Sequence, residues 1–317
     1  MAARAGAAGR PILKLRVLLL AAVWCCAQGA HAASASLRLC DRAAPMSATQ
    51  QDRLLRFAAL IKEELDGSGE TVALVARSGL DLSRFGVRYS HAGVSLKASD
   101  NAPWSVRQLY YACDEQRPRL YDQGLSGFVF GTDDANIGYV GIVLPAGADA
   151  ATLEGAALDN ARALRLLAAT YSANAYPFSL RYQNCNQWVA ELLAAAWGAL
   201  DDAPDLRARA QRWLAQRGYE PPAIDLDSHW LMLAVPFVPL VHLDDHPEAE
   251  LQALQMRTTL PGAIEAFVRE RNPGARRIQM CHNGGQAVVR YGWEPIAEGC
   301  RPQAGDRVID LDGASVS

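Results

Sequence analysis

The chain has 317 residues, of which 50% are hydrophobic and 21% charged, and its formal net charge is −3. This composition is typical of a globular protein, and the length allows one large domain, alone or with an appendage. Because no basic excess or basic cluster is present, nucleic-acid binding is excluded as a main function.

Residues 1–32 have the pattern of a secretory signal peptide. Four Lys or Arg residues and no acid precede a short apolar run and an Ala-x-Ala site that ends at Ala32. Removal of this leader lowers the formal charge by four, from −3 to −7. The leader predicts a periplasmic or secreted protein. Cys25 and Cys26 lack the small preceding residue of lipoproteins, and no later stretch predicts a membrane anchor.

The mature chain begins with a predicted helix and strand. Ser47 and Gln50 have the spacing of a capping box and open a helix to about Leu65. Residues 71–77 predict a strand, and residues 117–132 are interpreted as an aromatic loop.

The strand at residues 88–96 carries His91, the only histidine between residues 32 and 228. A turn near residues 99–103 joins it to a hairpin partner that contains Gln108 and Tyr110. A base on a strand is one half of the pairing that activates a cysteine nucleophile.

The other half is predicted at Cys185, after a strand at 138–145 and an amphipathic helix at 150–171. Asn184 suits an N-cap, with Gln187 three residues on, so a helix begins at Cys185 and runs to about residue 198. The helix dipole and a protonated histidine would lower the pKa of the thiol, whereas burial would raise it.

After residue 198 the pattern predicts helices at 205–218 and 261–271, with a lid or apolar flank between them. Residues 276–312 predict a small β segment. We therefore divide the chain into a leader, a domain at 33–200, and a region at 201–317 with a helical flank and the β segment.

The five mature cysteines are an odd number, so one thiol is expected to stay free. Cys281 and Cys300 flank a predicted strand pair and are expected to be bridged to each other. Cys40 and Cys113 then pair by elimination, which leaves Cys185 as the free thiol.

The motifs SHAGVSL and NCNQWVAELL resemble the circularly permuted branch of the papain-like superfamily, which includes permuted NlpC-type peptidases and lecithin:retinol acyltransferase-like enzymes. In that branch the histidine strand precedes the cysteine helix. The mature chain also resembles an exported proteobacterial family of unknown function, through the segments LSRFGVRYSHAGVSL, WSVRQLYYACDE, YSANAYPFSLRYQNCNQWVAELLAAAWG and GWEPIAEGC. The resemblance implies an α+β fold with an antiparallel sheet packed against helices and a small C-terminal β extension.

A third polar group that orients the histidine tends to lie on the following strand in these relatives. A turn centred near residues 99–100 places Gln108 opposite His91, and a register slip of two places Tyr110 there instead. The Cys185 backbone N–H is expected to hold the oxyanion. Its second donor is expected among Tyr182, Gln183 and Asn184, and the substrate is expected to contact these three residues and Trp188.

No cofactor or metal is expected. The cluster His242, Asp244, Asp245 and His246 has ligand types, but Pro247 follows and the aspartates suit a helix start. The sequence thus predicts a periplasmic cysteine hydrolase of the amidase or peptidase type, with a cell-wall peptide as first substrate and an acyl ester or acyl transfer as second. The alternative is a non-catalytic envelope protein for binding or scaffolding. The oligomeric state is left open.

Overall fold

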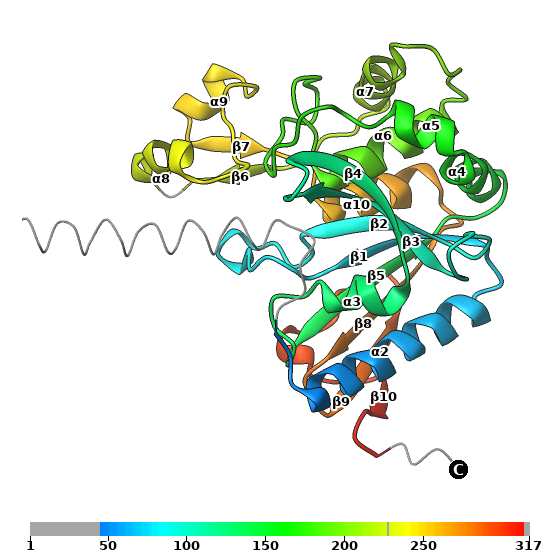
Figure 1. The fold of residues 1–317 in the computed structure, drawn as a ribbon. Coiled ribbons are helices and arrows are strands. Elements are labelled where there is room, and N and C mark those ends of the chain that lie inside the picture. Colours follow the sequence, from blue (N-terminus) through cyan, green and yellow to red (C-terminus); the bar gives the residue numbers. More distant parts are fainter. Residues whose placement is uncertain (1–44, 227, 314–317) are drawn as a thin grey trace, which may run out of the picture.

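An eight-stranded sheet is the centre of the molecule, which we describe from a computed structural model for residues 45–226 and 228–313 (Figure 1). The strand order is β10-β9-β8-β5-β1-β2-β3-β4, and every neighbouring pair is antiparallel. The strands are β1 (Val72–Arg77), β2 (His91–Leu96), β3 (Ser105–Ala112), β4 (Arg117–Gln123), β5 (Gly138–Leu144), β8 (Arg276–His282), β9 (Gln286–Tyr291) and β10 (Arg307–Asp310).

Helices cover both faces of this sheet (Figure 1). One face carries α2 (Ala48–Gly67) and α3 (Leu125–Phe130). The other carries α4 (Ala148–Leu158), α5 (Asn160–Arg165), α6 (Cys185–Trp197), α7 (Leu206–Gln216) and α10 (Pro261–Arg271). The 3₁₀ turns η1 (Ser83–Phe85) and η3 (Glu298–Cys300) lie in connecting segments.

The central strand β1 shows why the sheet needs a layer of helices on each side. Val72, Leu74 and Ala76 belong to the core under α4 and α6, whereas Ala73 and Val75 belong to the core under α2 and α3. Successive side chains of a strand point to opposite faces, so an unbroken apolar run is buried on both.

A small unit projects from the helical layer near α6 (Figure 1). It contains the two-stranded sheet of β6 (Ala223–Asp225) and β7 (Gln255–Arg257), together with α8 (His229–Ala234), η2 (Val235–Phe237) and α9 (Glu248–Gln252). This unit includes the described part of residues 221–251, the segment expected to form a lid or an apolar flank.

The expected loop at 117–132 and the single helix at 150–171 are wrong. Residues 117–123 form β4, which pairs along its whole length with β3, and residues 125–130 form α3. The helix is two helices, because Asp159 interrupts it and caps the second one by accepting from the N–H groups of Ala161 and Arg162.

The C-terminal β segment is part of the main sheet. Every residue of β8 pairs with β5, and β9 and β10 follow as the next strands. The segment after residue 200 therefore shares its cores with the segment before it.

The bridge between Cys281 and Cys300 is confirmed, with the two Cα atoms 5.6 Å apart. Cys113 is disulfide-bonded as well, and its expected partner, Cys40, lies outside the described residues, as does the expected leader 1–32. Cys185 is the only free cysteine in the part of the chain that the structure describes. Within that part, no helix has the length and apolar character needed to cross a membrane.

Candidate functional site

Cys185 is the first residue of α6, as the sequence predicts. The side chain of Asn184 caps this helix, with its oxygen 2.7 Å from the backbone nitrogen of Gln187. Gln187 does not complete the capping box, because its side-chain oxygen accepts no hydrogen bond from the described residues, while its side-chain nitrogen donates to Glu191 at 3.2 Å. The thiol nevertheless lies against the backbone N–H groups of Cys185 and Asn186, which stabilise the thiolate.

His91 is oriented by Gln108, whose Oε1 lies 2.8 Å from the imidazole Nε2. Gln108 in turn donates from its Nε2 to Oε1 of Gln123 at 2.6 Å, and this fixes which end of the amide faces the ring. Since Gln108 Oε1 can only accept, His91 Nε2 carries the proton. The neutral imidazole therefore keeps its lone pair on Nδ1, where a general base needs it.

The register that suggested Gln108 is off by two residues. Val94 pairs with Arg107 and Leu96 with Ser105, and extending this pairing puts Tyr110 across from His91. Gln108 reaches the imidazole diagonally instead, while the Tyr110 ring stacks on it with centroids 4.6 Å apart. Both candidates for the third group therefore contact His91.

Cys185 and His91 open into one cavity of about 340 Å³. Its polar end also includes Arg77, Tyr110, Tyr171 and Asn186. Its walls are mostly apolar and come from the segment around η1 and from the projecting unit, with Leu82, Phe85, Val87, Ile224, Val238 and Met256 among them. No hydrogen bond joins the Cys185 thiol to the imidazole within the described residues, so the shared cavity is what connects them.

Burial governs both titrating groups. It raises the pKa of the Cys185 thiol to about 11, and the backbone N–H groups, Arg77 and the Tyr171 hydroxyl oppose it. Burial, together with the charge of Arg77, lowers the pKa of His91 to about 3. The expected lowering of the thiol pKa by a protonated His91 is therefore wrong, since the site rests as a neutral thiol beside a neutral imidazole.

Sequence reasoning missed Tyr171 and Arg77. The Tyr171 hydroxyl lies beside the thiol, and burial raises the pKa of this phenol well above its ordinary value. Neither residue belongs to a recognisable motif, because both reach the cavity through the fold. The alternation of β1 could have placed Arg77 on the same face as Val75. Antiparallel pairing of the two predicted strands could have placed it near His91, because Arg77 is the cross-strand partner of His91 in the β1–β2 pair.

The four residues expected to bind substrate do not line this cavity. The side-chain amides of Gln183 and Asn184 are hydrogen-bonded within the fold. Gln183 donates to Leu166 O at 2.9 Å, and Asn184 donates to Thr258 Oγ1 at 2.8 Å. Trp188 is fully buried and donates to Ala163 O, and Tyr182 stacks on His242 with centroids 4.6 Å apart. These contacts favour a role in holding the N-terminus of α6.

The cluster around His242 also has framework contacts. His246 Nε2 lies 2.9 Å from Asn174 O, and Asp245 accepts from the backbone N–H of Tyr176. In the described ranges, no group of three or more His, Cys, Asp or Glu side chains is placed to hold a metal ion.

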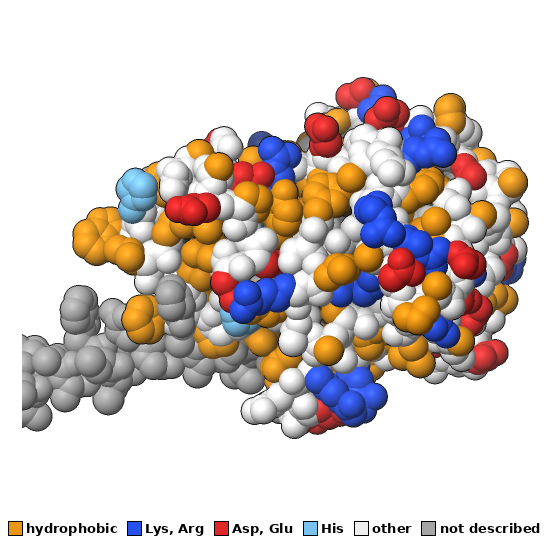
Figure 2. All heavy atoms as spheres, turned by 90° about the horizontal axis from the view of Figure 1, so that it is seen from above, with side chains coloured by type: hydrophobic (Ala, Val, Ile, Leu, Met, Phe, Trp, Pro, Cys, Tyr) orange, Lys and Arg blue, Asp and Glu red, His pale blue; other side chains and the backbone are white. Residues whose placement is uncertain are grey.

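The rim of the cavity is hydrophobic on the side of the projecting unit. Trp230 and Phe237 are each 79% exposed and Leu233 is 62% exposed, and Val238 continues this patch into the cavity wall. Figure 2 shows hydrophobic side chains gathered on the projecting end of the molecule.

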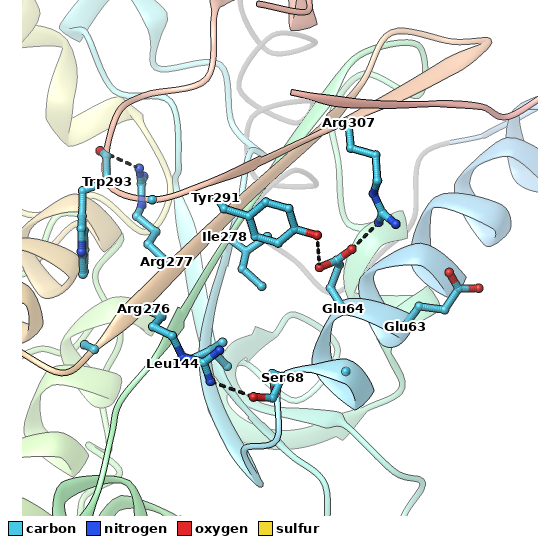
Figure 3. Close-up of a pocket in the computed structure, with 13 residues that line it drawn as sticks. Glu63, Glu64, Ser68, Leu144, Arg276, Arg277, Ile278, Tyr291, Trp293 and Arg307 are labelled. Atoms are coloured by element: carbon cyan, nitrogen blue, oxygen red, sulfur yellow. Dashed lines mark hydrogen bonds and ion pairs between the residues drawn. The ribbon is translucent and has the colours of Figure 1, made fainter. Parts of the chain in front are cut away.

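A second cavity of about 550 Å³ lies between the end of α2 and strands β8 and β9 (Figure 3). Two of its charged groups, Glu64 and Arg307, are paired with each other, and Glu64 also accepts from Tyr291. Arg276 donates to Ser68 O at 2.7 Å. No cysteine or histidine lines it. The cavity at Cys185 is therefore the candidate active site.

Comparison with known proteins finds one family. The profile of DUF2145, described as an uncharacterized protein conserved in bacteria, matches residues 64–268, which is more than half of the chain and includes His91 and Cys185. No curated protein and no solved structure matches the chain.

Proposed function

Since the chain belongs to the bacterial family DUF2145, we propose that this family supplies a cysteine hydrolase with the permuted papain-like arrangement, exported to the periplasm. One observation carries the proposal: the free thiol at the start of α6 and an imidazole held by Gln108 open into the same cavity. The order of these elements, histidine strand before cysteine helix, is the order of the permuted branch.

The proposed reaction is acyl transfer to water through Cys185. His91 Nδ1 takes the proton from the thiol, and Sγ forms a bond to the carbonyl carbon of the substrate. The bond to the leaving amine or alcohol breaks, and the leaving group takes the proton back from His91. Water then attacks the thioester, its proton passes to His91, and the acid leaves as the thiol is restored.

The resting geometry requires an adjustment before this proton transfer. The thiol and imidazole are not hydrogen-bonded, and the loose contacts of an empty site commonly tighten when substrate binds. The Cys185 backbone N–H, which already faces the sulfur, is the proposed oxyanion donor.

The substrate proposal remains a cell-wall peptide, with acyl transfer from an ester or thioester as a second candidate. The apolar walls of the cavity favour the second candidate, because they match a hydrocarbon better than a peptide with many polar groups.

A binding protein without catalysis is the other candidate. The raised pKa of the thiol and the missing hydrogen bond to His91 favour it, because an unactivated thiol is a poor nucleophile.

The test is hydrolysis of cell-wall peptides and of acyl esters of increasing chain length by the mature protein. Cys185→Ala should abolish hydrolysis, His91→Gln should reduce it by at least two orders of magnitude, and Ser99→Ala, which is remote from the cavity, should leave it unchanged. Hydrolysis that survives Cys185→Ala would contradict the proposal.

A further inference from the structure

Arg77 is the buried positive charge of the candidate site. It ends β1 and is 5% exposed, and it lines the same cavity as Cys185 and His91. A buried arginine is ordinarily paired with a carboxylate, because an isolated charge loses its hydration without compensation. Among the described residues, no carboxylate lies within ion-pairing distance of this guanidinium.

Neutral oxygens hold the guanidinium instead. Its Nη1 donates to the carbonyl oxygens of Ser78 and Gly131, and its Nη2 donates to the Tyr110 hydroxyl at 2.6 Å. The Nε–H is buried and has no partner. These contacts satisfy hydrogen bonds but cancel no charge, so the guanidinium keeps its positive charge at the cavity wall.

The backbone is shaped around this side chain. A Cβ atom at Gly131 would lie 2.6 Å from Cζ of Arg77, and one at Gly79 would lie 2.5 Å from Nη1. Both distances are too short for a real contact, so glycine at these positions leaves the space that the guanidinium fills. Its place is therefore built from three segments, the end of β1, the turn after it and the end of α3.

Arg77 also acts on the imidazole of His91 through Tyr110. Tyr110, which accepts from Arg77, lies stacked on the imidazole of His91. Gln108 holds the edge of the same imidazole. The ring of His91 is thus fixed on one side by an amide and on another by a tyrosine that Arg77 anchors.

We propose, resting on the cysteine-hydrolase function above, that Arg77 is a positioning residue whose buried charge stabilises the anion formed at Cys185 while its bond to Tyr110 holds His91. In the permuted enzymes that the sequence resembles, a protonated histidine would be expected to supply this charge. Here the imidazole is neutral, and Arg77 favours that neutrality as well as the thiolate.

In the described part of the chain, no other group that faces the cavity can take this role from Arg77. The titratable or charged side chains on its walls are Arg77 on β1, His91 on β2, Tyr110 on β3, Asp133 after α3, Tyr171, and Cys185 on α6. The projecting unit contributes only uncharged residues to the lining. Asp133 is the single carboxylate among them, and its charge opposes a thiolate.

The experiment measures alkylation of Cys185 by iodoacetamide between pH 7 and pH 9, which needs no substrate. Arg77→Met should slow alkylation on the order of tenfold at each pH, the effect of one unit in pKa. Arg77→Lys, which keeps the charge, should recover most of that rate.

A second variant displaces the guanidinium without removing it. Gly131 has φ −73°, which alanine tolerates, so Gly131→Ala should act through the clash with Arg77 and slow alkylation too. Gly124→Ala, at the other end of α3 with nothing within 4 Å of the added Cβ, is the matched control and should react like the wild type. Thermal unfolding of each variant checks that it is folded.

Iodoacetate, which carries a carboxylate, separates two actions of Arg77. If Arg77 acts by stabilising the thiolate, its loss in Arg77→Met slows both reagents by the same factor. If only iodoacetate slows, Arg77 attracts an incoming anion and the proposal is overturned. Unchanged iodoacetamide rates in both Arg77→Met and Gly131→Ala overturn it as well. Since the hydrolase function is tested by turnover, shifted alkylation without hydrolysis would reject that function and keep the assignment of Arg77.

Discussion

At the scale of single residues, the imidazole of His91 is the group whose state most affects the candidate chemistry. It is buried, bonded through Nε2 to Gln108 and stacked on Tyr110. A charged imidazole in this place would lose hydration and lie near the positive charge of Arg77, so the neutral form is strongly preferred.

This preference predicts acid sensitivity. The pKa of His91 is about 3 in the folded protein, below its ordinary value of 6.5, so the unfolded chain binds the proton more tightly. The contribution of His91 to the free energy of unfolding is fully present above pH 6.5. It is lost as the pH falls towards 3, by about 1.4 kcal/mol per pH unit. His282, with a pKa lowered to about 4, acts in the same direction.

The measurement is urea unfolding at several values between pH 7 and pH 4, for the wild type and for His91→Gln. Because glutamine does not titrate but can still donate to Gln108, the variant should lose stability less steeply with falling pH. Equal slopes for the two proteins would show that His91 does not hold a lowered pKa.

The residues at the site differ in how well the sequence predicts them. Cys185 and His91 were identified from local patterns, and Gln108 from a hairpin register that was two residues off. Arg77 and Tyr171 were missed, because the pairings that bring Arg77 beside His91 and Tyr171 beside Gln183 were not predicted. A local pattern carries no information on the strand register that brings such a charge beside the histidine.

At the scale of elements, the N-terminus of α6 depends on one residue. Asn184 accepts the cap bond from Gln187 and donates to Ala173 O, Thr258 Oγ1 and Thr259 O. It therefore joins the helix to the segment before it and to the end of the projecting unit. The helix signals in the sequence predicted the cap, whereas the bonds to Thr258 and Thr259 depend on residues more than 70 positions away.

Replacement of Asn184 should destabilise the protein more than replacement of an ordinary N-cap residue. Asn184→Ala loses the acceptor and leaves buried partners unsatisfied, so we expect a loss of about 2 to 4 kcal/mol in the free energy of unfolding. Asn184→Asp keeps the acceptor and loses the donors, and should fall between the alanine variant and the wild type. Ser47→Ala, at the exposed cap of α2, should cost about 1 kcal/mol.

Chemical denaturation of the three variants checks this order. If Asn184→Asp matches the wild type, the bonds to the projecting unit contribute nothing to stability. If Asn184→Ala costs no more than Ser47→Ala, the cap of α6 is an ordinary one.

At the scale of the whole molecule, the sheet joins the two ends of the described chain. β8 lies beside β5, and helices from both halves of the sequence cover one face. Strands with continuous apolar runs, such as β1 and β5, were predictable from the sequence pattern alone. β4 and α3 were not, because the polar residues of β4 become a strand only through pairing with β3.

The Cys281–Cys300 bridge should stabilise this whole sheet. It closes a segment of 19 residues, for which loop entropy predicts about 3 kcal/mol. Cys281→Ala with Cys300→Ala should therefore lower the unfolding midpoint, and far-ultraviolet circular dichroism and tryptophan fluorescence should still report one coincident transition. Separate transitions would show that β8 to β10 unfold as an independent unit.

The most direct test of the central claim is mass spectrometry of the mature protein during reaction with an acyl p-nitrophenyl ester. The account predicts a transient acyl mass on the peptide containing Cys185, formed with a burst of p-nitrophenol and removed by water, and strongly slowed in His91→Gln. An acyl mass on another residue, or acylation and turnover that His91→Gln leaves unchanged, would contradict it.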